Sequence, residues 1–337
     1  MPTSPLRRSL DAALLDFAWS EWAQMGVLAS APRRSPWAED PEALIVFTLE
    51  VARDDPRLFD ELLDWLLRNE PLVSVRRLRS FAVDPEDRRL VDGALTWVDA
   101  HRPRARLRGR RQPQPSGEPA PLFTESDFPM REPDPSFLSA GFVRPPVEPS
   151  GKSQAPDLRA PINLAFRLRQ VLGLGARTEV VRLLLTSAAP SMSTADLAAG
   201  AGYARRNVLD AVGALQEGGV VSAVRGAGGQ RFAIDRAAWA ALLGLGDEQL
   251  PEARAWPQLL GALVRTRRWL RDAEGTDLSD YMRASRARDL MEEIAAPLSI
   301  AGIEVANGPG IETAWPDLER TVAYAVARLD VGSSPAR

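Results

Sequence analysis

Three adjacent residues, Arg205, Arg206 and Asn207, have side chains suited to reading nucleic-acid bases. Arginine can form paired hydrogen bonds with the edge of guanine, and asparagine can do the same with adenine. They stand near the start of residues 203–217, where apolar residues recur three and four positions apart: Val208, Ala211, Val212 and Leu215. This spacing predicts a helix that buries one face and presents the polar residues of its first turn to the outside.

The flanking residues predict the elements that position this helix. Ser193 and Asp196 form a helix start signal, because their side-chain oxygens can accept hydrogen bonds from unpaired N–H groups at a helix end. Glycine at 200 and 202 predicts a sharp turn between two helices, and Gly218–Gly219 ends the second one. Two strands and a glycine-rich turn are expected next, at residues 220–224, 231–234 and 225–229.

In this order of elements the region resembles the winged helix-turn-helix regulators of bacteria, in the broad manner of the ArsR and MarR families. The resemblance covers residues 176–243, roughly a fifth of the chain. It implies a protein that binds double-stranded DNA as a homodimer, because such regulators read paired half-sites. The chain departs from many relatives at Tyr203 and Ala204, where they place a small polar residue. The shared positions are Ser193, Leu197, Ala198, Gly202, Val208, Val212, Leu215, Gly219 and Val220.

The candidate DNA-contacting residues lie on the two helices and the hairpin. Arg225, near the tip of the glycine-rich turn, and Arg231 are expected to contact the DNA backbone. The full set is Ser193, Thr194, Tyr203, Ala204, Arg205, Arg206, Asn207, Arg225, Gln230 and Arg231. The charge distribution agrees with such a partner. Residues 161–244 carry nine arginines against five acidic residues, and residues 102–111 carry six arginines and no acid, although the whole chain has a formal net charge of −3.

Other kinds of chemistry find little support in the sequence. Cysteine is absent, which excludes disulfides, thiolate catalysis and cysteine-ligated metal sites, and His101 is the only histidine. Carboxylates such as Glu292–Glu293 stand at spacings typical of solvated helix surfaces. The glycines near residue 308 lack the spacing and the lysine of a phosphate-binding loop. We therefore expect no catalytic residues, no metal and no cofactor, and a protein that is not an enzyme.

The pattern along the chain predicts a mainly α, multidomain protein. A helical domain is expected at 1–101, a Pro/Arg-rich linker at 102–160, the winged helix-turn-helix at 161–244, and a helical C-terminal region for dimerisation or effector binding at 245–337. Arg76, Arg77 and Arg79 are expected on a solvated face, with contact to phosphate as the alternative.

The predicted linker is rich in proline. Thirteen of the 28 prolines lie between Pro103 and Pro161, which predicts a segment without regular helix or sheet. The arginines of residues 102–111 are expected to form either a basic arm along DNA or a solvated tether. Apolar residues scattered through the segment are expected to strap it onto a domain surface, or else to bind a partner: Leu122, Phe123, Phe128, Met130, Phe137, Leu138 and Phe142.

No apolar run approaches the roughly 20 residues of a membrane span, and the first residues lack the features of a signal peptide, so we expect a cytoplasmic protein. The main functional hypothesis is a DNA-binding transcriptional regulator. The alternative is an antitoxin-like or adaptor protein, in which the helical domains hold a protein partner and the winged helix contacts it.

Overall fold

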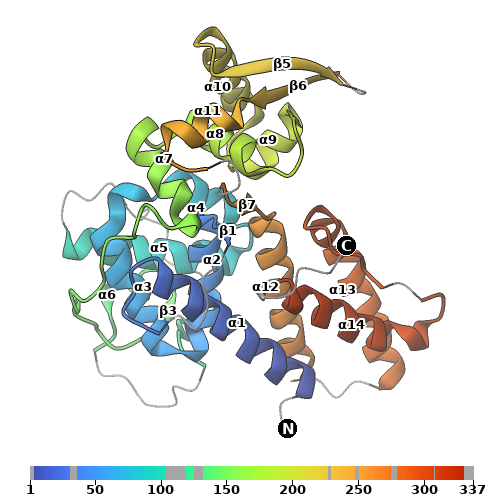
Figure 1. The fold of residues 1–337 in the computed structure, drawn as a ribbon. Helices are drawn as coiled ribbons and strands as arrows, with labels where there is room; N and C mark the ends of the chain where they lie inside the picture. Colours follow the sequence, from blue (N-terminus) through green and yellow to red (C-terminus); the bar gives the residue numbers. More distant parts are fainter. Residues whose placement is uncertain are drawn as a thin grey trace.

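The computed structural model describes residues 4–30, 36–102, 118–124, 132–226, 229–246, 250–274, 279–306 and 308–329. In this part the chain is mainly helical, as its sequence predicts (Figure 1). The N-terminal helices follow one another closely. Their bounds are α1 (Pro5–Gln24), α2 (Pro41–Val51), α3 (Pro56–Asn69), α4 (Val75–Phe81) and α5 (Pro85–His101).

Four of these helices begin with proline, whose missing N–H costs nothing at a helix start. The residue before each proline caps the helix with its side chain, as the Asp40 carboxylate does by accepting from the N–H of Ala43 at 3.2 Å. The same arrangement is built on Ser4, Asp55 and Asp84. Local sequence therefore determines where α1, α2, α3 and α5 start.

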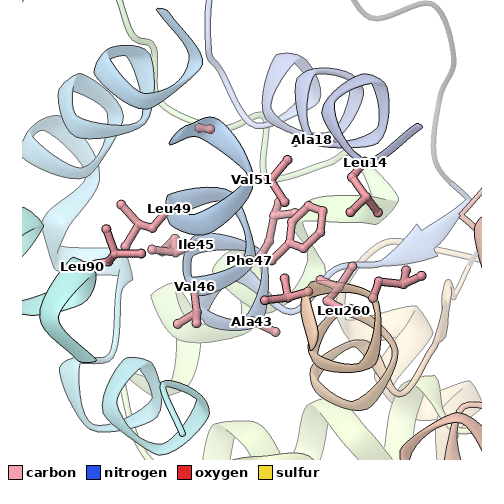
Figure 2. Packing of buried hydrophobic residues seen from close by; sticks show 14 of the residues in the cluster. Leu14, Ala18, Ala43, Ile45, Val46, Phe47, Leu49, Val51, Leu90 and Leu260 are labelled. Carbon is pink, nitrogen blue, oxygen red and sulfur yellow. The ribbon is translucent and has the colours of Figure 1, made fainter. Parts of the chain in front are cut away.

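Helix α2 is the centre of the molecule, since all eleven of its residues are buried. Figure 2 shows Leu90 of α5 beside Ile45 and Leu49, and Leu260 on the other side of the helix, near Phe47. Burial of each large apolar side chain of this kind contributes roughly 1.5–3 kcal/mol. The helices packed around α2 are α1, α3, α4, α5 and α12 (Trp256–Glu274).

The proline-rich segment is attached to this core in its described part. Leu122, Phe123, Phe137 and Phe142 are buried, as expected of a strap, but Leu138 is exposed. Phe128, Met130 and residues 104–111 lie outside the described residues. The prediction that the segment lacks regular structure is wrong at β2 (Ala120–Pro121), α6 (Pro135–Leu138) and β3 (Phe142–Val143), where β2 and β3 pair in parallel. The Asp134–Pro135 pair accounts for α6, because the Asp134 side chain caps it.

Residues 164–245 pack around a second apolar core. Its helices are α7 (Leu164–Leu172), α8 (Ala176–Thr186), α9 (Thr194–Ala201), α10 (Arg205–Glu217) and α11 (Arg236–Leu242). Strands β4 (Met192–Ser193), β5 (Val221–Gly226) and β6 (Gly229–Ile234) form an antiparallel sheet in the order β4-β6-β5. In Figure 1 this part lies at the top, and the β5–β6 hairpin extends away from it.

The chain then returns to the first core. Strand β7 (Glu252–Ala253) pairs in parallel with β1 (Trp37–Ala38), and the indole of Trp256 donates to the carbonyl of Ala38 at 2.9 Å. Helix α12 packs on α2, and α13 (Asp280–Ile300) and α14 (Ala314–Ala327) pack beside it. Residues of α12, α13 and α14 belong to the same apolar cluster as α1 to α5.

Candidate nucleic-acid interface

Helices α9 and α10 meet at a tight turn that the sequence specifies locally. At the start of α9, the Ser193 hydroxyl accepts from the N–H of Asp196 while the Asp196 carboxylate accepts from the N–H of Ser193, both at 3.2 Å. Gly202 ends α9 with a φ of +66°, a conformation that favours glycine. The predicted start of the next helix at Tyr203 is wrong by two residues. Ala204 has an extended backbone (ψ 141°) and is the residue before α10.

Helix α10 buries the face that its spacing predicts, through Val208, Ala211, Val212 and Leu215. The opposite face and the hairpin carry the exposed candidate residues: Ala204, Arg205, Arg206, Arg225 and Gln230. In the described part of the chain, no carboxylate pairs with Arg205, Arg206 or Arg225. The first turn of α10 therefore presents two uncompensated guanidinium groups to the outside, and the hairpin presents a third.

Three further candidates have structural roles. Ser193 is occupied by the cap of α9, and Thr194 beside it is half-buried. Arg231 on β6 donates to the Ser191 hydroxyl (3.0 Å) and to the Ser191 carbonyl (2.6 Å), which ties the loop before β4 to the sheet. The prediction that Arg231 contacts the DNA backbone thus applies to a side chain that already has two protein partners.

Tyr203 and Asn207 face the first core, where the structure adds a residue that lies outside the predicted set. The guanidinium of Arg76 on α4 lies over the Tyr203 ring, 5.3 Å from its centroid. The side-chain oxygen of Asn207 accepts from two N–H groups of Arg76, at 2.8 and 3.0 Å, in the amide orientation that suits both partners. The Tyr203 hydroxyl also lies 3.3 Å from that of Ser74. These two candidate residues are therefore engaged with α4.

The expectation of a solvated face is wrong for Arg77, the neighbour of Arg76, which is completely buried. Arg77 forms ion pairs with Asp40 and Glu42 at the start of α2. Arg169 of α7 bridges Glu42 and Glu179, at 2.7 Å to each. Arg182 of α8 joins Glu179 (2.8 Å) to Asp40 (3.0 Å). Asp40, Glu42, Arg77, Arg169, Glu179 and Arg182 are referred to below as the closed cluster; the side chain of each is at most 2% exposed.

The closed cluster is neutral, with three guanidinium and three carboxylate groups, and it links the two apolar cores. Burial alone would raise the pKa of Glu179, but the surrounding arginines outweigh it and hold this pKa well below its usual range. Arg77 also donates through Nε to the carbonyl of Ala201 at the end of α9, at 2.9 Å. The turn before α10 is thus tied to the start of α2.

Packing supports the same connection. A side chain at Gly202 would meet the Ser80 hydroxyl at 2.9 Å and the Phe81 ring at 3.0 Å. Next to this contact lies an open groove of about 550 Å³ between α4, the α9–α10 turn, α12 and α13, and its lining includes Arg76, Tyr203 and Ala204. Arg76 therefore borders open space, although its neighbour Arg77 does not.

Comparisons of the chain with protein-family models, with curated proteins and with solved structures found no match. Among the residues that the structure describes, no helix is long and apolar enough to cross a membrane.

Proposed function

We propose that this protein is a DNA-binding regulator that reads double-stranded DNA with a winged helix-turn-helix formed by residues 176–243. The observation that carries the proposal is the order α8, β4, α9, α10, β5, β6 with sheet order β4-β6-β5. In a winged helix of this order, α10 is the recognition helix and the β5–β6 hairpin is the wing. The resemblance to bacterial regulators that the sequence suggests concerns the same residues.

The exposed arginines support this proposal. Arg205 and Arg206 stand in the first turn of α10, where a recognition helix contacts bases and where the helix dipole attracts phosphate. Arg225 is exposed on the hairpin, and in this proposal it contacts the backbone of the duplex. The surplus of positive charge is small, so we propose that tight binding takes two copies of the chain on paired half-sites. The proposal assigns no catalysis and no cofactor to the chain.

The test is a binding titration of a fluorescent mixed-sequence duplex at several salt concentrations. The double variant Arg205→Ala/Arg206→Ala should bind at least about tenfold more weakly. The slope of log affinity against log salt, which is negative, should decrease in magnitude by almost 2. The matched control is Arg68→Ala, which removes an exposed arginine from α3. Equal affinities for the double variant and the control, or no binding by the wild type at low salt, would contradict the proposal.

A second candidate function, protein binding, has one observation in its favour. Val171, Leu172 and Leu174 at the end of α7 are 61%, 40% and 38% exposed, and Leu242 of α11 is 69% exposed. Arg167 of α7 donates to the Leu243 carbonyl, which ties α7 to the end of α11. Exposed apolar side chains of this kind occur at protein interfaces. Copurification of a stoichiometric protein without retained DNA would support this candidate over the first.

A further inference from the structure

We infer that Arg76 of α4 is part of the DNA-binding surface, so that this surface extends from the winged helix-turn-helix onto the N-terminal helical core. The inference rests on the proposed function and adds a residue that lies about 130 positions away from the recognition helix in the sequence. Three properties of Arg76 carry it: its position, its charge and its rigidity.

The position of Arg76 follows from two contacts on one side of the start of α10. Tyr203 and Asn207 are four residues apart and both face α4. Their contacts with Arg76 place its guanidinium beside the first turn of the recognition helix, next to the side on which Arg206 is exposed. A phosphate that approaches Arg206 and the N–H groups of this turn would therefore be near Arg76 as well.

The charge of Arg76 is available for a ligand. Its side chain is exposed, and in the described ranges no carboxylate forms an ion pair with it. Its two partners, a tyrosine ring and an amide oxygen, are neutral and leave its positive charge uncompensated. The other two arginines of α4 each have a carboxylate partner. Arg77 is neutralised inside the closed cluster, and Arg79 lies 3.5 Å from Asp92.

Arg76 is also held in place before any ligand arrives. Helix α4 is fixed to the α9–α10 turn by the bond from Arg77 to the Ala201 carbonyl, and Phe81 packs against Gly202. The stacking on Tyr203 and the two hydrogen bonds to Asn207 then restrict the Arg76 side chain. A preorganised side chain loses less conformational entropy on binding than a mobile one.

This arrangement gives new roles to two residues that the sequence suggested as base readers. The side-chain oxygen of Asn207 accepts hydrogen bonds from Arg76, and the Tyr203 ring supplies the aromatic face on which the guanidinium lies. We assign both as positioning residues.

The experiment compares Arg76→Ala and Arg76→Lys with Arg68→Ala as the matched control, in the full chain. The probe is a fluorescent mixed-sequence duplex titrated from low to physiological salt. Arg76→Ala should bind several-fold more weakly, and by a similar factor on unrelated sequences. Its slope of log affinity against log salt should decrease in magnitude by about 0.9. Arg76→Lys keeps the charge and should retain most of the slope. Far-ultraviolet circular dichroism and the thermal midpoint report whether each variant is folded.

The outcomes separate this inference from the proposed function. Binding by the wild type that is weakened in Arg205→Ala/Arg206→Ala but unchanged in Arg76→Ala would overturn the inference and leave the proposed function standing. An equal loss in Arg76→Lys and Arg76→Ala would also overturn it, because a structural effect on Asn207 would then account for both. If the wild type does not bind the duplex at low salt, the proposed function fails and the inference fails with it.

Discussion

The two ends of helix α2 each belong to a cluster of ion pairs, and the two clusters differ in how far water can reach their charged groups. At its start, Asp40 and Glu42 belong to the closed cluster, which reaches α4, α7 and α8 and has no side chain more than 2% exposed. At its end, Glu50 is completely buried but its arginine partners lie closer to the surface. The open cluster consists of Glu50 with Arg53, Arg267, Arg268 and Arg271, and of the outer carboxylates Asp11, Asp54, Glu86 and Asp87.

The difference lies in what happens when a partner is lost. The side chains of Asp11, Asp54 and Glu86 are 17%, 21% and 24% exposed, so water can solvate the outer part of the open cluster. Water has no such access to the closed cluster, and an unpaired charge there costs several kcal/mol. The closed cluster thus ties the α9–α10 turn to the start of α2 through buried charges, whereas the open cluster joins α12 to the end of α2 through groups that water can reach in part.

The largest predicted effect is the replacement of Arg169 by methionine. Arg169 donates hydrogen bonds to both Glu42 and Glu179, and its loss leaves each with fewer donors in a buried site. We expect Arg169→Met to lower the free energy of unfolding by roughly 3–5 kcal/mol. Urea denaturation measures this, with the exposed Arg68→Ala as a control that should stay within about 0.5 kcal/mol of the wild type. A loss below about 1 kcal/mol would mean that the closed cluster relaxes or admits water.

A smaller effect is expected from Arg268→Met in the open cluster. Arg268 donates to Glu50 and Asp87, but Glu50 also accepts from Arg267 at 3.1 Å and lies 3.5 Å from Arg53. The remaining arginines compensate the buried charge, so we expect a loss of about 1–3 kcal/mol. The same urea titration measures it. A loss as large as that of Arg169→Met would show that losing an arginine costs the same free energy of unfolding in both clusters, which would contradict the distinction between them.

Asp87 of the open cluster and Glu179 of the closed cluster should contribute pH dependences of opposite sign. Burial, opposed by Arg268 and assisted by the charges of Glu50 and Asp84, raises the pKa of Asp87 to about 6. Between pH 4 and 6 the folded state therefore holds a proton on Asp87 that the unfolded state has released, and this contribution to stability is lost as the pH rises. Glu179, with its lowered pKa, instead contributes stability above its ordinary pKa that is lost in acid.

The variant Asp87→Asn isolates this contribution. From pH 4 to pH 6.5 the wild type should lose stability relative to Asp87→Asn by on the order of 2 kcal/mol. Paired urea titrations at each pH measure the difference between the two proteins, which cancels the titration of all other groups. A constant difference, or one that changes in the opposite direction, would show that Asp87 is already ionised in the folded state at pH 4.

Local signals in the sequence predict the elements well and the clusters poorly. Asp–Pro pairs at residues 40–41 and 55–56 mark helix starts, and the capping residues at 193 and 196 mark α9, because each depends on neighbours within four positions. Arg77 lies in VRRLRSF, a composition typical of a solvated face, and only its partners 35 and 124 residues away show that it is buried. Asn207 has the chemistry of a base reader, and no sequence pattern indicates that α4 lies beside it.

The smallest predicted effect tests how tightly the α9–α10 turn fits against α4. Both Gly202 and Gly219 have positive φ, +66° and +71°, and alanine at either position costs about 1–2 kcal/mol in backbone strain. Only at Gly202 does the added methyl group meet other atoms, Ser80 and Phe81, whereas the space at Gly219 is open. We expect Gly202→Ala to be less stable than Gly219→Ala by about a further 1 kcal/mol, measured by thermal denaturation. Equal losses would indicate that α4 moves aside at little cost.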